Sequence, residues 1–224
     1  DRDTTSVRLV VNPERMVIAE ARRTYTYLSL FGYRVDAVMA NRLLPDDVTD
    51  PWFDRWRSAQ VEHLAEIEDG FAPLPVLRAE LARDELVGLD RLRAFAAELY
   101  GSIELAAVLH EGEPFRIDRY GDDLTLVHEL PFADHDDLEV GRRDHELLVR
   151  IGPYRRFFAL PDSLRRRQVT AAQLRDGELR VSFRSPARDG APQESGQRRA
   201  GSADGSPVGA GRGSKPERSD GRTP

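Results

Sequence analysis

The stretch Val7-Arg8-Leu9-Val10-Val11-Asn12-Pro13-Glu14 decides the fold of the first half of this chain, because an apolar run stands directly before helix-starting residues. The run is short and rich in β-branched residues, which is typical of a buried strand. The next three residues supply a capping side chain, a proline at the first helical position and an acid in the first turn. We therefore predict a strand over residues 7–11 and a helix that starts at Asn12-Pro13-Glu14.

A second strand is predicted after this helix. Apolar residues recur at spacings of three and four up to Phe31, and Gly32 stands where a left-handed residue commonly ends a helix. The run Val35-Asp36-Ala37-Val38-Met39-Ala40 then predicts a strand covered on both faces. Strand, helix and strand in this order indicate a right-handed parallel crossover. Because ligands of open parallel sheets bind beyond the carboxyl ends of the strands, Asn41 is well placed for a ligand.

Two further helices and a strand complete the predicted α/β unit. Helical spacing covers residues 52–70 and 86–101. Residues 74–77 form a short apolar run, and Pro75 restricts that strand to a sheet edge or a strand start.

Twofold alternation of apolar residues replaces helical spacing after residue 113, as in strands with one buried face. Turn residues separate these segments at Gly121, Gly152-Pro153 and Asp176-Gly177. Several short strands without long helices predict a β-sandwich. The alternating residues are Phe115 and Ile117; Leu124, Leu126, Leu130 and Phe132; Leu147, Val149 and Ile151; Phe158 and Leu160; and Leu179, Val181 and Phe183.

The fold class predicted from these patterns is an α/β parallel-sheet unit followed by an all-β sandwich and a disordered tail. From Ser185 onward the chain has one valine and no aromatic residue, too little apolar area to offset the entropy lost on ordering. The predicted boundaries are 1–103 for the α/β unit, 104–113 for a linker, 114–184 for the sandwich and 185–224 for the tail.

Composition restricts the classes of partner. The 224 residues carry 39 acidic and 33 basic side chains, a formal charge of −6, so we expect no nucleic-acid partner. The chain has no cysteine, which is compatible with a reducing cytosol, and we expect a cytoplasmic protein. No apolar run approaches the ~20 residues of a membrane-spanning helix, so we do not expect an integral membrane protein. No signal peptide is visible at Asp1, and we expect the chain to begin within a longer protein.

Candidate metal and catalytic groups each have an ordinary structural alternative. The acidic run at residues 134–137 resembles a metal cluster, but adjacent side chains point apart and a solvated loop is the better interpretation. His63 and Glu66 are too few ligands for zinc, and His128 falls on the buried parity of its strand. We assign no metal site and no catalytic residue.

The aromatic residues near position 52 have two interpretations. Trp52, Phe53 and Trp56 could form an interaction patch. Aromatic residues at this helical spacing more often pack into the core, and we predict a packed position.

Five motifs of the first hundred residues resemble the C-terminal part of the ArsA-type ATPases, which drive anion pumps or target tail-anchored proteins. They occur in the order of that family: Val10-Val11-Asn12-Pro13-Glu14-Arg15-Met16; Tyr33-Arg34-Val35-Asp36-Ala37-Val38; Ala40-Asn41-Arg42-Leu43-Leu44-Pro45; Phe71-Ala72-Pro73-Leu74-Pro75; and Val87-Gly88-Leu89-Asp90-Arg91-Leu92.

The second domain is similar to the small heat-shock, or α-crystallin, sandwich that bacterial members carry at their C-terminus. Three shorter motifs carry this likeness: Tyr154-Arg155-Arg156, Leu160-Pro161 and Asp176-Gly177-Glu178-Leu179-Arg180-Val181.

The resemblance implies an ATP-binding site, with the phosphates and Mg²⁺ held by an N-terminal P-loop half and the adenine packed against the C-terminal strands. In that family the asparagine of a strand-end Asn-Arg or Asn-Gln pair contacts the base, which implies Asn41, beside Arg42, as the base-binding residue here. An amide suits adenine because it offers a donor and an acceptor together. The family's second adenine contact comes from the loop after residue 77, where this chain has Glu80 and Leu81 in place of proline and leucine. The zinc-binding cysteine pair of the eukaryotic branch has no counterpart here.

The chain departs from the family in its catalytic residues. A P-loop needs Gly-x-x-x-x-Gly-Lys-Ser/Thr, and the single lysine of this chain, Lys215, follows Ser214 and precedes Pro216. We therefore expect no ATP hydrolysis by the chain alone.

Two hypotheses follow from this departure. The first is an ATPase segment that couples ATP hydrolysis to anion or client-protein handling, with a P-loop half of the same or another chain as its partner. The second is a non-enzymatic, chaperone-like protein-binding module. In either case we expect a monomer or a homodimer that associates through the α/β part.

Overall fold

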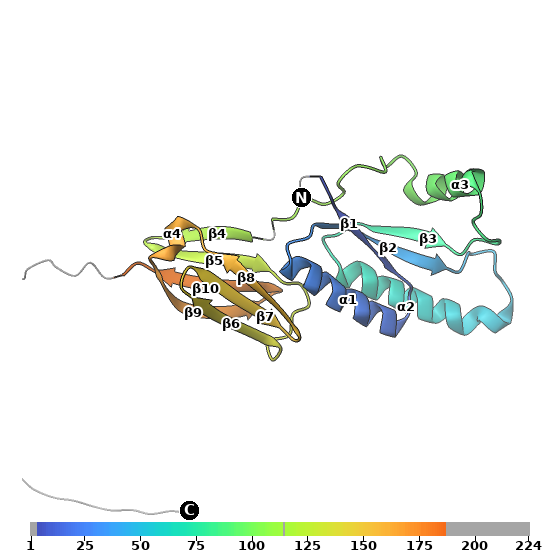
Figure 1. The fold of residues 1–224 in the computed structure, drawn as a ribbon. Helices are drawn as coiled ribbons and strands as arrows, with labels where there is room; N and C mark the ends of the chain where they lie inside the picture. The colour runs from blue at the N-terminus through green and yellow to red at the C-terminus, as the bar shows by residue number, and fades with distance from the viewer. Residues whose placement is uncertain (1–3, 114, 187–224) are drawn as a thin grey trace, which may run out of the picture. The chain divides into compact units, whose positions relative to one another are not determined.

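The computed structural model describes residues 4–113 and 115–186 (Figure 1). The predicted tail therefore lies outside the described residues, apart from residues 185 and 186. The fold class agrees with the prediction: a parallel sheet with helices precedes two antiparallel sheets.

The α/β part is built on a three-stranded parallel sheet of order β1-β2-β3. The strands are β1 (Val7–Val11), β2 (Val35–Leu43) and β3 (Val76–Glu80), and β2 is central. Helices α1 (Arg15–Leu30) and α2 (Asp54–Gly70) contribute Ile18 and Ile67 to the core on one face, and α3 (Leu89–Tyr100) contributes Leu99 on the other. The middle of β2 is buried because helices cover both faces of the sheet (Figure 1).

The ends of α1 agree only in part with the sequence prediction. Gly32 has φ +76° and follows the C-cap residue Phe31, as predicted for a left-handed terminus. The predicted start of the helix at Asn12-Pro13-Glu14 was wrong. The helix begins at Arg15, its N-cap residue is Glu14 in an extended conformation, and no side chain caps it. Asn12 is therefore available for another contact.

The segment at residues 104–113 is fixed to the α/β sheet by polar contacts. Asp36, fully buried in β2, accepts a hydrogen bond from the backbone N–H of Leu109 (3.1 Å) and lies 3.4 Å from the Arg8 guanidinium. Arg8 also donates to the carbonyl oxygen of Ala107 (2.7 Å). Burial opposes the charge of Arg8, but hydrogen bonds with Tyr100 and Asp36 leave its pKa above the ordinary value. These contacts hold Ala107 and Leu109, in the middle of the segment, against β1 and β2.

The β-sandwich consists of a four-stranded and a three-stranded antiparallel sheet. The first has the order β4-β5-β10-β9 and the second β6-β7-β8. Their inner faces share one apolar core, which includes Leu126, Leu147 and Phe183. A one-turn helix, α4 (Asp162–Arg165), precedes β9. The strands are β4 (Phe115–Tyr120), β5 (Asp123–Glu129), β6 (Leu138–Arg143), β7 (Glu146–Ile151), β8 (Tyr154–Ala159), β9 (Gln168–Arg175) and β10 (Glu178–Arg184).

Two strands and one turn of the sandwich differ from the prediction. Strands β6 and β9 were not predicted, because most of their residues are polar or only half-buried and alternation is weak there. Phe132 does not continue β5: the strand ends at Glu129, and Phe132 has φ +60° in the following turn. His128 lies in the core as predicted, 2% exposed and stacked on Phe115 with ring centroids 3.9 Å apart.

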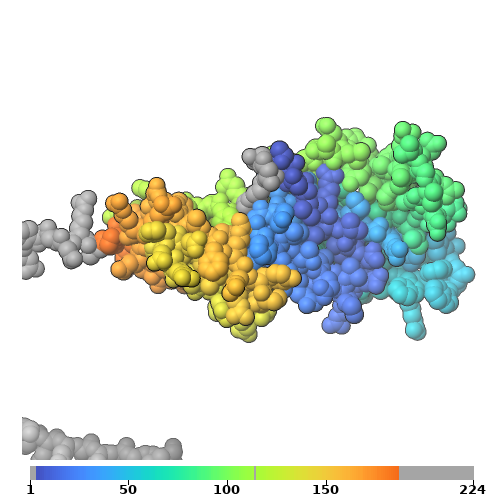
Figure 2. Space-filling view, in the orientation of Figure 1, coloured from blue at the N-terminus to red at the C-terminus, as the bar shows by residue number. Residues whose placement is uncertain are grey.

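The C-terminal end of α1 packs into the sandwich. Leu30 is fully buried among the core residues of the two β-sheets, and Arg156 of β8 donates a 2.8 Å hydrogen bond to its carbonyl oxygen. The rings of Tyr27 and Tyr154 lie 4.3 Å apart, and the Thr26 hydroxyl donates to the carbonyl of Pro131. In Figure 2 the blue surface that contains this end of α1 adjoins the yellow-orange surface of the sandwich. The helix is therefore shared by both hydrophobic cores.

Candidate functional site

Two asparagines meet at the carboxyl ends of β1 and β2. Asn12 follows the last residue of β1, and Asn41 lies near the end of β2, with which β1 pairs in parallel up to Ala40. The Asn41 Nδ2 group lies 3.4 Å from Asn12 Oδ1, and both residues are half-buried. The parallel register brings the two amides together at the edge where ligands of such sheets bind.

A β-bulge re-aims the end of β2. Ala40 pairs with Arg78 and Leu43 pairs with Glu80, so β2 has one residue more than β3 over this interval. Arg42 takes φ +59°, a conformation that costs a non-glycine residue free energy. Bulges commonly redirect side chains next to binding sites. Here the irregularity falls directly on the Asn41-Arg42 pair.

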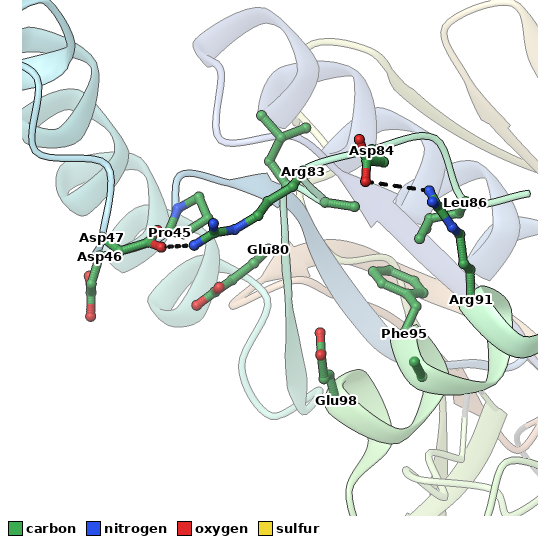
Figure 3. Close-up of a pocket in the computed structure, with 13 residues that line it drawn as sticks. Pro45, Asp46, Asp47, Glu80, Arg83, Asp84, Leu86, Arg91, Phe95 and Glu98 are labelled. Carbon is green, nitrogen blue, oxygen red and sulfur yellow. Dashed lines mark hydrogen bonds and ion pairs between the residues drawn. The ribbon is translucent and has the colours of Figure 1, made fainter.

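The other two predicted residues, Glu80 and Leu81, lie at the same carboxyl edge. Glu80 ends β3, and the backbone N–H of Leu81 donates to the carbonyl of Leu43 (2.7 Å). Both side chains are exposed and line a cleft of about 690 Å³ between the loop after β2, the loop after β3 and α3 (Figure 3). The other lining residues are Pro45, Asp46, Asp47, Ala82, Arg83, Asp84, Leu86, Arg91, Ala94, Phe95 and Glu98.

The charges of this cleft leave its walls acidic. Its two arginines are engaged: Arg83 pairs with Asp47, and Arg91 Nη1 lies 3.6 Å from Asp84 Oδ2 (Figure 3). In the described ranges neither Glu80 nor Glu98 forms an ion pair, and both line the cleft. Acidic walls repel a phosphate group, because both are negatively charged. The surface beside Leu81 is partly apolar and partly polar, which suits an uncharged planar group.

Arg42 belongs to a second cleft of about 470 Å³, which Asn12, Trp52, Trp56 and His63 also line. Backbone atoms of the loop after β2 fix one wall, because the Leu44 N–H donates to a Gln60 side-chain oxygen of α2 (2.6 Å). The bulge thus separates the predicted site residues: Arg42 lines this cleft, whereas Glu80 and Leu81 line the acidic one.

The prediction that Trp52 and Trp56 pack into the core was wrong. Their exposed fractions are 70% and 57%. Trp52 belongs to a short 3-10 helix, η1 (Pro51–Phe53), whose start is capped by the Asp50 carboxylate at 2.8 Å from the Trp52 N–H. Trp52 lies in this turn and Trp56 lies in the first turn of α2, and both line the cleft that Asn12 and Arg42 share.

Comparison with known proteins identifies the two halves of the chain. Residues 1–101 match the family model described as "Anion-transporting ATPase", and residues 121–183 match the "HSP20-like domain found in ArsA". The chain belongs to the ArsA-type ATPase family. The resemblance inferred from the strand-end motifs and from the sandwich motifs is therefore confirmed.

Relatives in this family are similar over both domains. A Chlorobaculum tepidum protein named "Putative arsenical pump-driving ATPase" is 36% identical over 183 residues, which are 82% of this chain and 45% of that protein. An Aquifex aeolicus protein named "Putative arsenical pump-driving ATPase 1" is 31% identical over 183 residues, 80% of this chain and 46% of its own length. The chain thus spans about half the length of these relatives.

One solved structure is similar to about a third of this chain. A small heat shock protein from Synechococcus phage S-ShM2 aligns with 34% of this chain and 98% of its own, at 17% identity and a TM-score of 0.28.

No helix in the described ranges is long and apolar enough to cross a lipid bilayer.

Asn12, which lies beside Asn41 at the strand ends, was not predicted to belong to the candidate site. Asn12 was assigned to helix capping, because asparagine is among the preferred N-cap residues. Its position directly after a parallel strand, one strand away from Asn41, was the feature that indicated a second role.

Proposed function

We propose that this chain supplies the adenine side of an ATP site. The observation that carries the proposal is the Asn41 amide, which lies beside Asn12 at the carboxyl edge of the parallel sheet because β1 and β2 pair in parallel register. Arg42, Glu80 and Leu81 flank this position, each on the wall of a neighbouring cleft. The family membership supports nucleotide use.

The chemistry of Asn41 fits a purine base. The 3.4 Å separation from Asn12 is longer than a typical N–H···O hydrogen bond of about 2.7–3.2 Å, so this contact is readily exchanged for a better one. In the part of the chain that the structure describes, Asn41 Oδ1 accepts no hydrogen bond. One amide can therefore offer a donor and an acceptor to adenine at once.

The same residues do not fit the phosphates or Mg²⁺. The sequence holds no Gly-rich loop followed by lysine, and the cleft beside Glu80 has acidic walls. We therefore propose that a P-loop half, on the same or another polypeptide, binds the phosphates with Mg²⁺, and that hydrolysis requires both halves. The α/β part then binds and orients the base, and the HSP20-like sandwich makes protein contacts during anion or client-protein handling in the cytoplasm.

A second candidate function is a chaperone-like module that binds partners without nucleotide. The exposed Trp52 and Trp56 side chains favour it, because two large exposed aromatic residues beside one cleft are typical of interaction surfaces. Nucleotide dependence separates the two functions.

The test compares the chain alone with a form joined to a P-loop half of the family. Calorimetric titration with MgATP and MgADP should detect tight binding only in the joined form. In that form Asn41→Ala should weaken binding by about 1–3 kcal/mol, or roughly 5- to 150-fold, because a bidentate contact to the base is lost. Gln168→Ala, which removes an exposed amide of the sandwich, is the matched control and should leave affinity unchanged.

Two results would contradict the proposal. Unchanged affinity after Asn41→Ala would remove this residue from the site. A joined form that binds no nucleotide but still binds protein partners would favour the chaperone-like module instead.

A further inference from the structure

The sandwich is open along one side, where an apolar groove of about 550 Å³ lies between β4 and β8. Phe115, Ile117 and Leu126 form one wall, and residues 156–161 form the other. Ile117 is 40% exposed and Phe157 is 45% exposed, although both belong to strands of the sandwich. The groove therefore exposes apolar surface that would favour burial.

Both strands that border this groove are sheet edges. Among the described strands, β4 pairs only with β5 and β8 pairs only with β7. An edge strand presents backbone N–H and carbonyl groups on its outer side, which an extended peptide can match by adding a strand. Backbone pairing and apolar pockets are thus available together.

Two exposed arginines beside the groove make its surroundings positively charged. Arg119 shares a face of β4 with Phe115 and Ile117, and Arg155 shares a face of β8 with Phe157. Both arginines are exposed, and neither forms an ion pair within residues 4–113 and 115–186. The arginines that line the groove itself are already engaged: Arg116 lies 2.7 Å from Glu178, and Arg156 donates to the carbonyl of Leu30.

We propose that the groove between β4 and β8 binds an extended apolar segment of a partner protein, flanked by acidic residues. Alternate large side chains of the segment enter the apolar walls, its backbone extends an edge strand, and its carboxylates pair with Arg119 and Arg155. The proposal deepens the interaction role given to the sandwich above, but it requires no nucleotide.

The chain's own C-terminal segment does not have this chemistry. Residues 187–224 contain Val208 as their one large aliphatic residue and no aromatic residue, so they cannot provide alternating large apolar side chains. A second copy of the chain could pair edge to edge, but two copies would bring their Arg119 and Arg155 side chains toward like charges. An acidic partner segment fits the charges better.

The test uses the full chain without nucleotide and a fluorescein-labelled peptide, Glu-Leu-Thr-Phe-Thr-Leu-Glu, in a fluorescence-anisotropy titration. Saturable binding is expected, whereas a peptide with serine in place of leucine and phenylalanine should not bind. Combining Arg119→Glu with Arg155→Glu should weaken binding roughly three- to tenfold, because two peripheral charge pairs become repulsive. This variant should bind a peptide with lysine in place of both terminal glutamates more tightly than it binds the original peptide.

Further variants separate the groove from general effects of charge. Arg55→Glu reverses an exposed arginine of α2 that has no ion pair among the described residues, and should leave binding unchanged. Phe157→Ser should weaken binding without altering the circular dichroism spectrum, because this side chain is half exposed.

The outcomes discriminate between occupants. Loss of affinity in the groove variants together with the charge-swapped preference supports the proposal. Absent saturable binding, or binding that the groove variants leave unchanged, overturns it. A doubled mass in sedimentation that Arg119→Glu abolishes, with no peptide binding, would assign the groove to a second copy. The outcome for ATP has no effect on any of these measurements.

Discussion

Replacing Gly32 with alanine should destabilise the protein more than the same change at a comparable glycine. Gly32 has φ +76° after α1, and an added Cβ would lie 2.8 Å from Arg156 Nη1. That guanidinium group donates the 2.8 Å hydrogen bond to the Leu30 carbonyl. Gly121 also has a positive φ, +61°, but has no atom within 4 Å of its added Cβ. The pair therefore separates backbone strain from loss of the Arg156 contact.

The expected magnitudes follow from these contacts. A left-handed alanine costs about 1–2 kcal/mol at either position. Arg156 is a flexible side chain and can move aside, so the extra cost at Gly32 is that of one hydrogen bond from a charged donor, about 1.5–3 kcal/mol. Gly121→Ala should therefore lower the free energy of unfolding by about 1–2 kcal/mol and Gly32→Ala by about 2.5–5 kcal/mol. The difference corresponds to roughly 3–12 °C in Tm for a protein of this size.

Chemical denaturation of a double-mutant cycle measures this coupling. In an Arg156→Met background, which keeps most of the aliphatic stem, Gly32→Ala should cost no more than Gly121→Ala does. The inference that Arg156 holds the end of α1 in the sandwich is refuted if Gly32→Ala and Gly121→Ala cost the same in the wild-type background. An unchanged cost of Gly32→Ala after Arg156→Met would refute it equally.

Three further predictions concern buried or paired ionisable groups. Asp36→Ala should cost about 3–5 kcal/mol in denaturant unfolding, because it leaves a largely buried arginine without its carboxylate; a loss below 1 kcal/mol would contradict that role. Burial, with a smaller effect of Glu129, raises the pKa of Tyr25 from 10.0 to about 12, so stability should be full below pH 10 and fall between pH 10 and 12. Tyr25→Phe should remove that part of the pH dependence of unfolding; an alkaline profile that does not change would count against it. The hydrogen bond from Arg116 lowers the pKa of Glu178 below its ordinary value of 4.5. The stability that this ion pair contributes should therefore be present above pH 4.5 and should disappear as the pH falls through the lowered pKa. Arg116→Gln should remove this part of the acid dependence of the free energy of unfolding.

Local patterns in the sequence predicted most elements of the α/β part. Three of these patterns involve only neighbouring residues: the β-branched run before Asn12, the helical spacing up to Phe31 and the position of Gly32. The structure has a strand, a helix and a left-handed residue at these places. The weakly alternating strands β6 and β9 were missed, because their pairing depends on partners that a local pattern does not contain.

The candidate site was predictable only in part. Asn41 could be placed at the end of a strand from the sequence, and its role in base binding stays a prediction. The partnership of Asn12 with Asn41 depends on the parallel register of two strands that are 29 residues apart at these positions. The bulge at Arg42, which sends Arg42 and Glu80 to separate clefts, depends on pairing with β3.

The sequence by itself determined the succession of strands and helices in the α/β part, the change from helical to twofold periodicity and the family, because each of these is encoded in residues close together along the chain. Only the tertiary structure decided that Leu30 enters the sandwich core, that Trp52 and Trp56 remain exposed and that one side of the sandwich is open. These features depend on which surfaces meet after the chain has folded. A helical stripe of apolar residues does not specify whether a neighbouring element covers it.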